Sequence, residues 1–543
     1  MTTNKTRRRF LAQSSLIAMG LSATSRFSTA ADRPRNPNGH VVGEPTAEAV
    51  GEKILSEGGN AIDAIVAAAL AVAVAAPNQT GIGGYGISAI VAVDSGKQVV
   101  AIDGNTMAPA ATQSDIFRSV AEGKDQRRVN AVGWLAAGVP GILAGLQLLI
   151  DRFGTLSFSE LVQPAIAIAT HGFPWPANLA AVVRGDATFA NDPGSRKLYF
   201  RDGQPLSAGQ IYKNLDLASM LKTLANSNSV EAFYRGDIAQ RIADDFQKNG
   251  GLVTAKDLAA YEAKVVEPLS MSWNDMTIQT PPLTAGGITV LQSLKTLQAM
   301  KWSEIASDIE QLHAKIEASR WAWNDRLTLL GDPSFANVPI ERLLSNEYAE
   351  RTADKIKEVV QKKSFIPFPI ETKTQGGTIS LSAVDRNGNM AVLTLTHGEA
   401  FGSRVTVDGL GLTLGHGMSR FDVRPDHPNA PGPGKRPLHN MVPTIVSRSG
   451  QANMAVGGRG GRKIINAVLE TLTQYVGKQK TLSTAINSAR FHTEGNSQIE
   501  LEKSTAPEAR EAMKQIGYNI KESASATLSA VAIENSQLHA SMR

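Results

Sequence analysis

One run in the last third of the chain alternates small or polar residues with apolar ones, and a second apolar run follows it. The first run covers residues 378–384 and the second covers 390–396, with Asp-Arg-Asn-Gly-Asn between them. Alternation with a period of two is typical of β-strands, and Asn-Gly between two such runs indicates a tight hairpin turn. The pattern therefore predicts an antiparallel strand pair with Thr378 at the head of its first strand, directly after Gly376 and Gly377.

Periodic apolar residues also predict two helices near the beginning of the chain, over residues 46–57 and 61–76. Asn60 is placed to cap the second helix, which is apolar almost all round. Such a helix is expected to lie buried between layers. Strands are expected to follow at 87–93 and 99–103.

A glycine-rich segment at 81–86 has the spacing G-x-G-x-x-G. In a dinucleotide-binding fingerprint a strand precedes the glycines and a helix follows them. Here the expected order is helix, glycines, strand, so the cofactor interpretation fails. We expect a loop that brings backbone close to a substrate.

The middle of the chain, 131–335, is expected to be mostly helical, with a short strand pair within 269–280. Residues 353–374 are charged, then polar with prolines, which predicts an exposed linker directly before Thr378. Beyond it, a strand is expected at 454–456 and a helix at 463–476. The composition shift near Thr374 is the best internal boundary.

Composition removes several classes of chemistry. The chain has 543 residues and no cysteine, which excludes disulfides, cysteine–zinc sites and thiol nucleophiles. Its nine histidines are scattered without metal-ligand spacing, and no G-x-S-x-G occurs. No metal and no cofactor are therefore expected.

The first thirty residues have the order of a targeting signal. A twin-arginine pattern at 6–11 precedes a weakly apolar stretch at 14–23 and a small-residue cleavage site at 28–30. The apolar stretch is too short for a stable membrane span. Residues 1–30 hold five basic residues and no acids, which equals the formal net charge of +5, so the remainder is formally neutral. We expect export to the periplasm or the exterior, no stable membrane insertion and no nucleic-acid binding.

Threonine is the nucleophile that remains. An N-terminal threonine carries its own base, because its α-amine titrates near ~7.7–8.0. Such a mechanism needs a chain break at the threonine and donors for an oxyanion. The glycine-rich segment 457–462, before the expected helix at 463–476, is either a plain strand-to-helix turn or a pair of N–H groups aimed at an oxyanion.

The chain contains a series of motifs at 58–64, 77–86, 136–141, 162–165, 251–254, 281–287, 325–333 and 434–438. Together they carry a family resemblance over nearly the whole mature length. The chain resembles the γ-glutamyltransferases, which are N-terminal-nucleophile hydrolases. The resemblance implies an α/β fold, an αββα sandwich with additional helices, made as one precursor that cleaves itself between Gly377 and Thr378. The expected products are a large subunit, 31–377, and a small subunit, 378–543, that stay bound to each other.

The resemblance also implies roles for individual residues. Thr378 would attack substrate amides and form an acyl-enzyme that water or an amine resolves. Thr396 matches the threonine that hydrogen-bonds the nucleophile, and Thr394 is a weaker candidate for that role. Gly460 and Gly461 match the oxyanion-hole pair of the family.

The chain departs from the family at the substrate clamp. Asn105 stands where the family has an arginine for the α-carboxylate, and Arg420 replaces the aspartate that takes the α-amino group. His439 and Asn440 replace paired serines, and Gly398 replaces an asparagine. We expect Asn105, Arg420, His439 and Asn440 to line the substrate site.

The reversed charge changes the expected substrate. Repulsion between an α-ammonium and Arg420 in a partly dry cleft costs about 1–3 kcal/mol. An acyl group with a carboxylate that Arg420 and His439 bind is therefore expected. Arg404 and Arg459 are either helpers in this or solvated surface arginines, and the second interpretation is favoured. The segment between 421 and 435 is short, which predicts that a lid over the site is missing.

Three hypotheses follow. The first is an exported, self-processing amide hydrolase or transferase for which γ-glutamyl compounds such as glutathione remain possible. The second is hydrolysis of another acyl amide, as in relatives that resemble cephalosporin acylases or oxamate amidohydrolase. The third is an inactive ligand-binding scaffold. The expected partners are a small amide, a water or amine acceptor, and the protein's own cleaved subunit.

Overall fold

The structure is a computed structural model, and it describes residues 36–119, 129–369 and 377–543. The expected signal segment at 1–30 lies outside these residues. So do Gly376 and the last part of the expected linker, 370–374.

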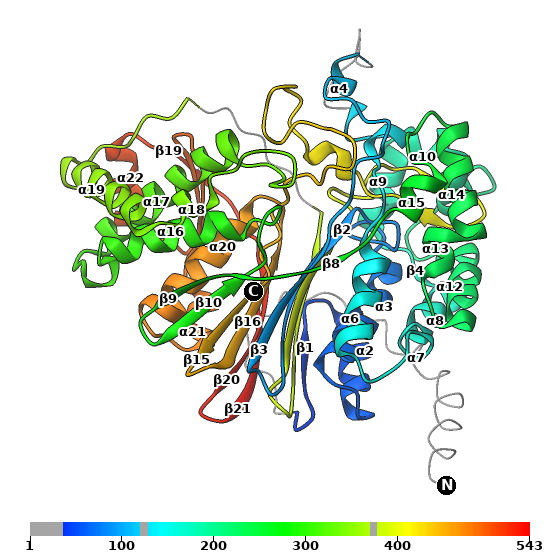
Figure 1. Cartoon of the computed structure of the whole chain (residues 1–543), viewed down its shortest axis with the longest axis horizontal. Helices are drawn as coiled ribbons and strands as arrows, with labels where there is room; N and C mark the ends of the chain where they lie inside the picture. Colours follow the sequence, from blue (N-terminus) through cyan, green and yellow to red (C-terminus); the bar gives the residue numbers. More distant parts are fainter. Residues whose placement is uncertain (1–35, 120–128, 370–376) are drawn as a thin grey trace.

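Two six-stranded sheets form the centre of the described protein (Figure 1). The first has the order β1-β11-β12-β2-β3-β8, and its neighbouring strands are antiparallel. Its strands are β1 (Gly39–Val42), β11 (Ile379–Asp385), β12 (Met390–Thr396), β2 (Gly86–Val93), β3 (Gln98–Gly104) and β8 (Lys264–Val266). The second has the order β21 (Gln537–Met542), β20 (Thr527–Glu534), β16 (Gln451–Arg459), β15 (Thr444–Arg448), β10 (Met276–Thr280) and β9 (Leu269–Trp273).

Helices pack on the outer face of each sheet, on opposite sides of the pair (Figure 1). The helices beside the first sheet, and the helices behind them, are α2 (Pro45–Ser56), α3 (Ala61–Ala75), α6 (Ile142–Phe153), α8 (Gln163–His171), α12 (Leu215–Ser227) and α14 (Asp237–Lys248). Those on the side of the second sheet are α16 (Gly287–Ala299), α17 (Asp308–Leu329), α19 (Asn346–Lys362), α20 (Lys463–Leu472), α21 (Leu482–Asn487) and α22 (Pro507–Ile516).

The expected hairpin is confirmed as β11 and β12, paired antiparallel with Ile379 opposite Leu395. Asp385 holds its turn, because one carboxylate oxygen accepts from the N–H groups of Asn387 and Asn389 at 2.9 and 3.1 Å. Its other oxygen accepts from the N–H of Ala61 at 3.0 Å. One aspartate thus connects the hairpin turn to the first turn of α3.

The two faces of the hairpin have different partners, as the period of two requires. Leu381, Leu393 and their same-face neighbours belong to the core cluster that contains α3. On the other face, Ser382 donates to the carbonyl of Ser529 on β20 at 2.9 Å. Apolar residues of both sheets, among them Val392 and Val531, form a further core between them. The hairpin is therefore covered by helices on one side and by the second sheet on the other.

The expectation that the second helix is buried is confirmed. Every residue of α3 from Ala61 to Val74 is buried. The side chain of Asn60 caps the helix by accepting from the N–H groups of Ile62 and Asp63. The carboxylate of Asp63 in turn accepts from the N–H of Asn60. This capping box satisfies donors that would otherwise be unpaired at a buried helix end.

The prediction of an exposed linker at 353–374 is wrong for its first part, because α19 continues to Lys362. Ala353, Ile356 and Val360 are buried in α19. Their spacing of three and four residues forms an apolar stripe, and its packing outweighs the charged composition of the segment.

Among the residues that the structure describes, no helix is both long and apolar enough to span a membrane.

Candidate active site

Thr378 and Thr396 face each other at the open end of the hairpin. Ile379 pairs with Leu395, so the next pair outward is Thr378 with Thr396. Their Oγ1 atoms are 3.1 Å apart. Both side chains are buried, with Thr378 7% exposed and Thr396 1% exposed. The alternation places both threonines on the face toward the second sheet.

The hydrogen bonds around Thr396 fix the direction of each proton. Its Oγ1 contacts the carbonyl oxygen of Gly377 and accepts from the N–H of Gly398 at 2.8 Å. A carbonyl only accepts, so the single hydroxyl proton of Thr396 is donated to Gly377. The hydroxyl of Thr378 must then donate to Thr396. This arrangement polarises the Gly377 carbonyl and gives the Thr378 proton an acceptor.

Gly377 adopts a backbone conformation that other residues rarely take. Its φ is +150°, and a Cβ at this position would lie 2.5 Å from the carbonyl carbon of Glu399. The backbone of Glu399 cannot yield as a flexible side chain would. Glycine is therefore required where the chain passes this close to the loop that follows Thr396.

Gly460 and Gly461 follow β16 at the same end of the sheets as Thr378. Early in β16, the N–H of Ala452 donates to the carbonyl of Gly96, and Gly96 lies near Gly388 of the hairpin turn. Farther along β16, a Cβ on Gly457 would lie 2.4 Å from Oγ of Ser380. The strand thus runs from the turn toward the threonines.

The backbone at the two glycines leaves two N–H donors without a backbone acceptor among the described residues. Gly460 has a φ of +135° and Gly461 a φ of +63°. Within the described ranges, neither N–H group donates to a backbone carbonyl, although both carbonyls accept bonds from the start of α20. Two donors without a backbone partner at the end of a strand can stabilise a developing oxyanion.

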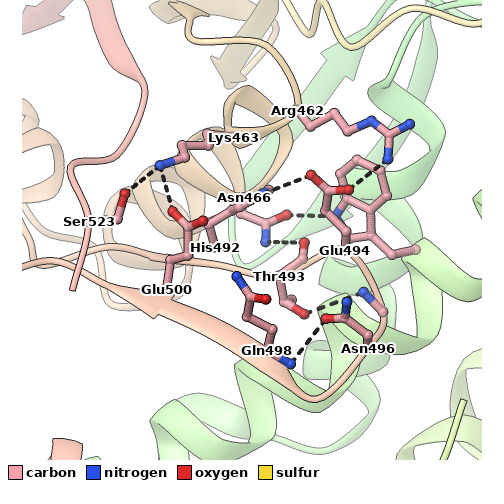
Figure 2. Close-up of polar contacts among 12 residues, drawn as sticks. Arg462, Lys463, Asn466, His492, Thr493, Glu494, Asn496, Gln498, Glu500 and Ser523 are labelled. Carbon is pink, nitrogen blue, oxygen red and sulfur yellow. Dashed lines mark hydrogen bonds and ion pairs between the residues drawn. The ribbon is translucent and has the colours of Figure 1, made fainter. Parts of the chain in front are cut away.

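A polar network holds the start of α20, directly after these glycines (Figure 2). Nη1 of Arg462 lies 2.6 Å from Oε2 of Glu494, which is 4% exposed. Nζ of Lys463 lies 2.6 Å from Oε2 of Glu500 and donates to Ser523 at 2.7 Å. Burial alone would raise the pKa of Glu494, but its contacts with His492 and Arg462 hold that pKa below its usual range. Ion pairs thus anchor the two residues that follow Gly461.

Asn105 is buried and its side chain is used within the protein. Its Nδ2 donates to Oγ1 of Thr284 at 2.9 Å and to the carbonyl of Pro437 at 2.8 Å. Its Oδ1 accepts from the N–H of Thr106 at 2.9 Å. Both amide protons are therefore committed to other segments, and Asn105 ties the end of β3 to the loops around 284 and 437.

Arg420 lies beside Gly398, His416 and Tyr85. Its Nη2 is 3.4 Å from Nε2 of His416, and its guanidinium lies over the Tyr85 ring at 5.8 Å. The N–H of Tyr85 donates to the carbonyl of Thr396 at 3.0 Å. Burial, together with Arg420, holds the pKa of His416 well below its usual range, so this imidazole is neutral. The structure thus brings Arg420 to the side of the threonine pair.

His439 and Asn440 share one partner, Arg326 of α17. Nη2 of Arg326 donates to the carbonyl of His439 at 2.8 Å and to Oδ1 of Asn440 at 3.2 Å. Burial, with the charges of Arg326 and Arg420, lowers the pKa of His439 to about 3. His439 is therefore a neutral donor or acceptor, not a charge, at neutral pH.

The remaining arginines named from the sequence have other roles. Arg404 forms an ion pair with Asp186. Arg459 donates to Oε1 of Gln79 at 3.2 Å. Thr394 pairs with Ser380, two residues from Thr396, and its hydroxyl is buried without a hydrogen bond in the described structure. Neither these two arginines nor Thr394 forms a hydrogen bond or an ion pair with Thr378 in the described structure.

Two residues near the site were not selected from the sequence. His416 precedes Arg420 by one helical turn, and Arg326 belongs to a motif that the family resemblance includes. Neither has a spacing that marks it as a site residue. His416 is a sequence neighbour of Arg420, whereas Arg326 contacts His439 across 113 residues of sequence.

Comparison with known proteins gives a family match. The profile of the family described as Gamma-glutamyltranspeptidase matches residues 47–542. The chain is 34% identical over 496 residues to the glutathione hydrolase proenzyme of Escherichia coli (strain K12), covering 88% of this chain and 84% of that protein. It is 32% identical over 490 residues to the acylase ACY 1 proenzyme of Pseudomonas sp. (strain SE83), covering 88% of this chain and 86% of that one.

A solved structure has a similar fold. The chain superposes on the cephalosporin acylase from Bacillus halodurans with a TM-score of 0.82 and 24% sequence identity, covering 96% of each chain. This similarity concerns the mixed arrangement of helices and sheets.

Proposed function

The chain belongs to the gamma-glutamyltranspeptidase family of enzymes, and on that premise we propose that it is an exported precursor that cleaves itself between Gly377 and Thr378. The mature enzyme then hydrolyses or transfers the acyl group of a small amide through an acyl-enzyme on Thr378. The observation that carries this proposal is the position of the Thr396 hydroxyl, which contacts both the Gly377 carbonyl and the Thr378 hydroxyl.

The first step is an attack within the chain. Oγ1 of Thr378 adds to the Gly377 carbonyl carbon, and the carbon–nitrogen bond breaks as the Thr378 nitrogen takes a proton. Water hydrolyses the resulting ester, which leaves a carboxylate on Gly377 and a free α-amine on Thr378. The products are the large subunit 31–377, once the signal is removed, and the small subunit 378–543. Both contribute strands to the first sheet, which favours their staying together.

The second step uses the same hydroxyl on a substrate. The new α-amine accepts the hydroxyl proton, and Oγ1 attacks the amide carbonyl while Gly460 and Gly461 N–H groups stabilise the oxyanion. The amine leaves, and water or another amine releases the acyl group. We assign the two facing sheets and their outer helices to the αββα sandwich of the N-terminal-nucleophile hydrolases.

Mass spectrometry of the purified wild type tests this proposal. We expect two fragments, with the smaller one starting at Thr378, and an acyl adduct on that residue during turnover. One intact chain without amidase activity would leave the ligand-binding scaffold as the better account. Fractionation of cells that express the full chain tests export.

A substrate other than a γ-glutamyl compound is the second candidate, because Arg420 lies beside the threonine pair and Asn105 is committed elsewhere. Glutaryl and γ-glutamyl p-nitroanilides differ only by the α-ammonium group. We expect wild-type kcat/KM to favour the glutaryl compound by about tenfold or more, because Arg420 repels the ammonium. Steady-state kinetics with both compounds measures this preference.

Variants at position 420 provide the matched control. Arg420→Gln removes the repulsion and should bring the two rates closer, and Arg420→Asp should reverse the preference. An unchanged ratio in both variants would contradict the role of Arg420 in specificity.

The network behind the oxyanion donors yields another prediction. Glu494→Gln keeps an acceptor for Arg462 but removes the charge that pairs with it. We expect kcat to fall about tenfold with little change in KM, less than the ~100-fold typical of removing an oxyanion donor, because the N–H groups are displaced but not lost. Glu502→Gln is the control, since Glu502 pairs with Arg543 at 2.8 Å and makes no hydrogen bond or ion pair with residues 460–463 in the described structure. Equal effects of the two substitutions on kcat would contradict a positioning role for Glu494.

A further inference from the structure

Backbone strain gathers in the loop that follows Thr396. In the described part of the chain, thirteen residues other than glycine have a positive φ, and eleven of them are exposed. The other two are Phe401, with a φ of +60° and a buried ring, and Arg404, with a φ of +64°. Bulky side chains rarely adopt this conformation, and such strain persists only where surrounding contacts impose it. The loop 398–404 is therefore shaped by its contacts and not by local preference.

The first residues of this loop contact both groups of the proposed cleavage. The N–H of Gly398 donates to Oγ1 of Thr396 at 2.8 Å. The backbone of Glu399 lies against Gly377, since a Cβ on Gly377 would lie 2.5 Å from the Glu399 carbonyl carbon. A displacement of the loop would therefore move the Thr396 hydroxyl and the Gly377 carbonyl relative to each other.

Hydrogen bonds inside the loop connect its two ends. The N–H of Arg404 donates to the carbonyl of Phe401 at 3.0 Å, and the N–H of Gly402 donates to the carbonyl of Glu399 at 2.9 Å. These bonds make a compact turn of residues 399–404. The position of Arg404 is thus passed to Glu399, and through Glu399 to Gly377.

The middle of the loop is fastened by the ring of Phe401. Its centroid lies 5.2 Å from that of Phe189 and 5.3 Å from that of Tyr199, edge to face in both cases. These rings belong to a buried aromatic cluster that also contains Trp175. This packing fixes the turn on one side.

The far end of the loop is fastened by an ion pair. Nη1 of Arg404 contacts Oδ2 of Asp186, which lies between α9 (Ala177–Gly185) and α10 (Thr188–Asn191). The two side chains are only 23% and 16% exposed. Oδ1 of Asp186 accepts from the N–H of Thr188 at 2.9 Å, which fixes the carboxylate at the start of α10.

We propose that Arg404 and Asp186 are a pair of positioning residues for self-cleavage, which holds the loop 398–404 against Gly377 and Thr396. This inference rests on the proposed self-cleavage and adds two residues to it. Glycine would adopt the φ of Arg404 without strain, so an arginine at this position is explained by the contact of its side chain.

Rates of self-cleavage in variants of the pair test the proposal. Arg404→Gln and Asp186→Asn each remove the charge at one end of the contact. We expect either change to slow the disappearance of the precursor about tenfold, because the loop no longer fixes the two reacting groups. The double variant should be no slower than either single variant, since both changes remove the same contact. Arg404→Lys keeps a charge at this position and should retain part of the rate.

Arg404→Gly separates positioning from stability. Glycine relieves the backbone strain but removes the ion pair, so we expect cleavage as slow as in Arg404→Gln with an equal or higher melting temperature. A merely structural role would instead make the cleavage rate follow the melting temperature across the variants.

Three results would overturn the proposal. They are a wild-type cleavage rate in Arg404→Gly, a wild-type rate in Asp186→Asn, and effects that multiply in the double variant. The second result would also show that the charge of Arg404, and not its contact with Asp186, is what matters.

Failure of the proposed function is a separate outcome, recognised as one intact wild-type chain in mass spectrometry. Hydrogen exchange of residues 398–404 then tests the pair by itself. We expect the N–H groups of Gly402 and Arg404 to exchange about tenfold faster in Asp186→Asn than in wild type, because the turn opens more often. Equal exchange in the two proteins would overturn the proposal without reference to cleavage.

Discussion

Replacing Thr378 with alanine is expected to leave one uncut chain without amidase activity. The substitution removes the only hydroxyl that contacts Thr396 Oγ1 among the described residues, and with it the attacking atom of both proposed steps. Removal of a catalytic nucleophile typically costs ~10⁴-fold or more in rate. Folding should be nearly unaffected, because the loss of one hydrogen bond costs about 1 kcal/mol. Denaturing gels, intact mass and thermal melting measure the three effects.

Serine at position 378 is the matched control. Thr378→Ser keeps the hydroxyl and loses only a methyl group, so we expect slower but detectable cleavage into the same two fragments. Cleavage of Thr378→Ala at Gly377 would show that another group attacks the bond. Equal inactivity of both variants with normal melting would show that the methyl group, not only the oxygen, is required.

Thr396→Val is expected to slow self-cleavage by about 10²–10³-fold, comparable to the loss of an oxyanion donor. Valine matches threonine in shape but provides neither the proton that polarises Gly377 nor the acceptor for the Thr378 hydroxyl. It also leaves the Gly398 N–H unpaired, which costs about 1–3 kcal/mol of stability. A time course of precursor disappearance after synthesis gives the rate, and thermal melting gives the stability.

Thr396→Ser separates the hydroxyl from the shape of the side chain. We expect it to retain most of the cleavage rate, since all three contacts of Oγ1 can be kept. If Thr396→Val cleaves as fast as wild type, the proton directions derived for this site are wrong. If Thr396→Ser is as slow as Thr396→Val, the methyl packing of Thr396 dominates its hydrogen bonds.

The hairpin and the buried helix α3 could be predicted because their signals are local. A period of two with an Asn-Gly turn, and an apolar stretch after an Asn cap, specify their elements within about fifteen residues. The facing positions of Thr378 and Thr396 then follow from the hairpin register. Their catalytic roles stay predictions from the family resemblance.

The helix at 353–362 and the contacts around His439 could not be predicted in the same way. The charged composition at 353–362 concealed an apolar stripe whose packing partners lie in other helices. Arg326 contacts His439 across 113 residues of sequence, so no local pattern reveals that its Nη1 is left without a partner. Burial of a charge depends on tertiary contacts, and a single sequence shows the charge without them.

The close packing at Gly398 determines the order in which substitutions at this site can be accepted, in evolution or in engineering. A Cβ on Gly398 would lie 2.1 Å from the ring of His416 and 3.1 Å from Nη2 of Arg420. A single-site library at 398 should therefore contain almost no active members. A smaller residue at 416 removes this overlap, while any side chain at 398 must in addition adopt the strained φ of +102° found there, so a change at 398 depends on a prior change at 416 and the two positions are epistatic. A search for altered specificity around Arg420 thus requires libraries in which positions 398 and 416 vary together.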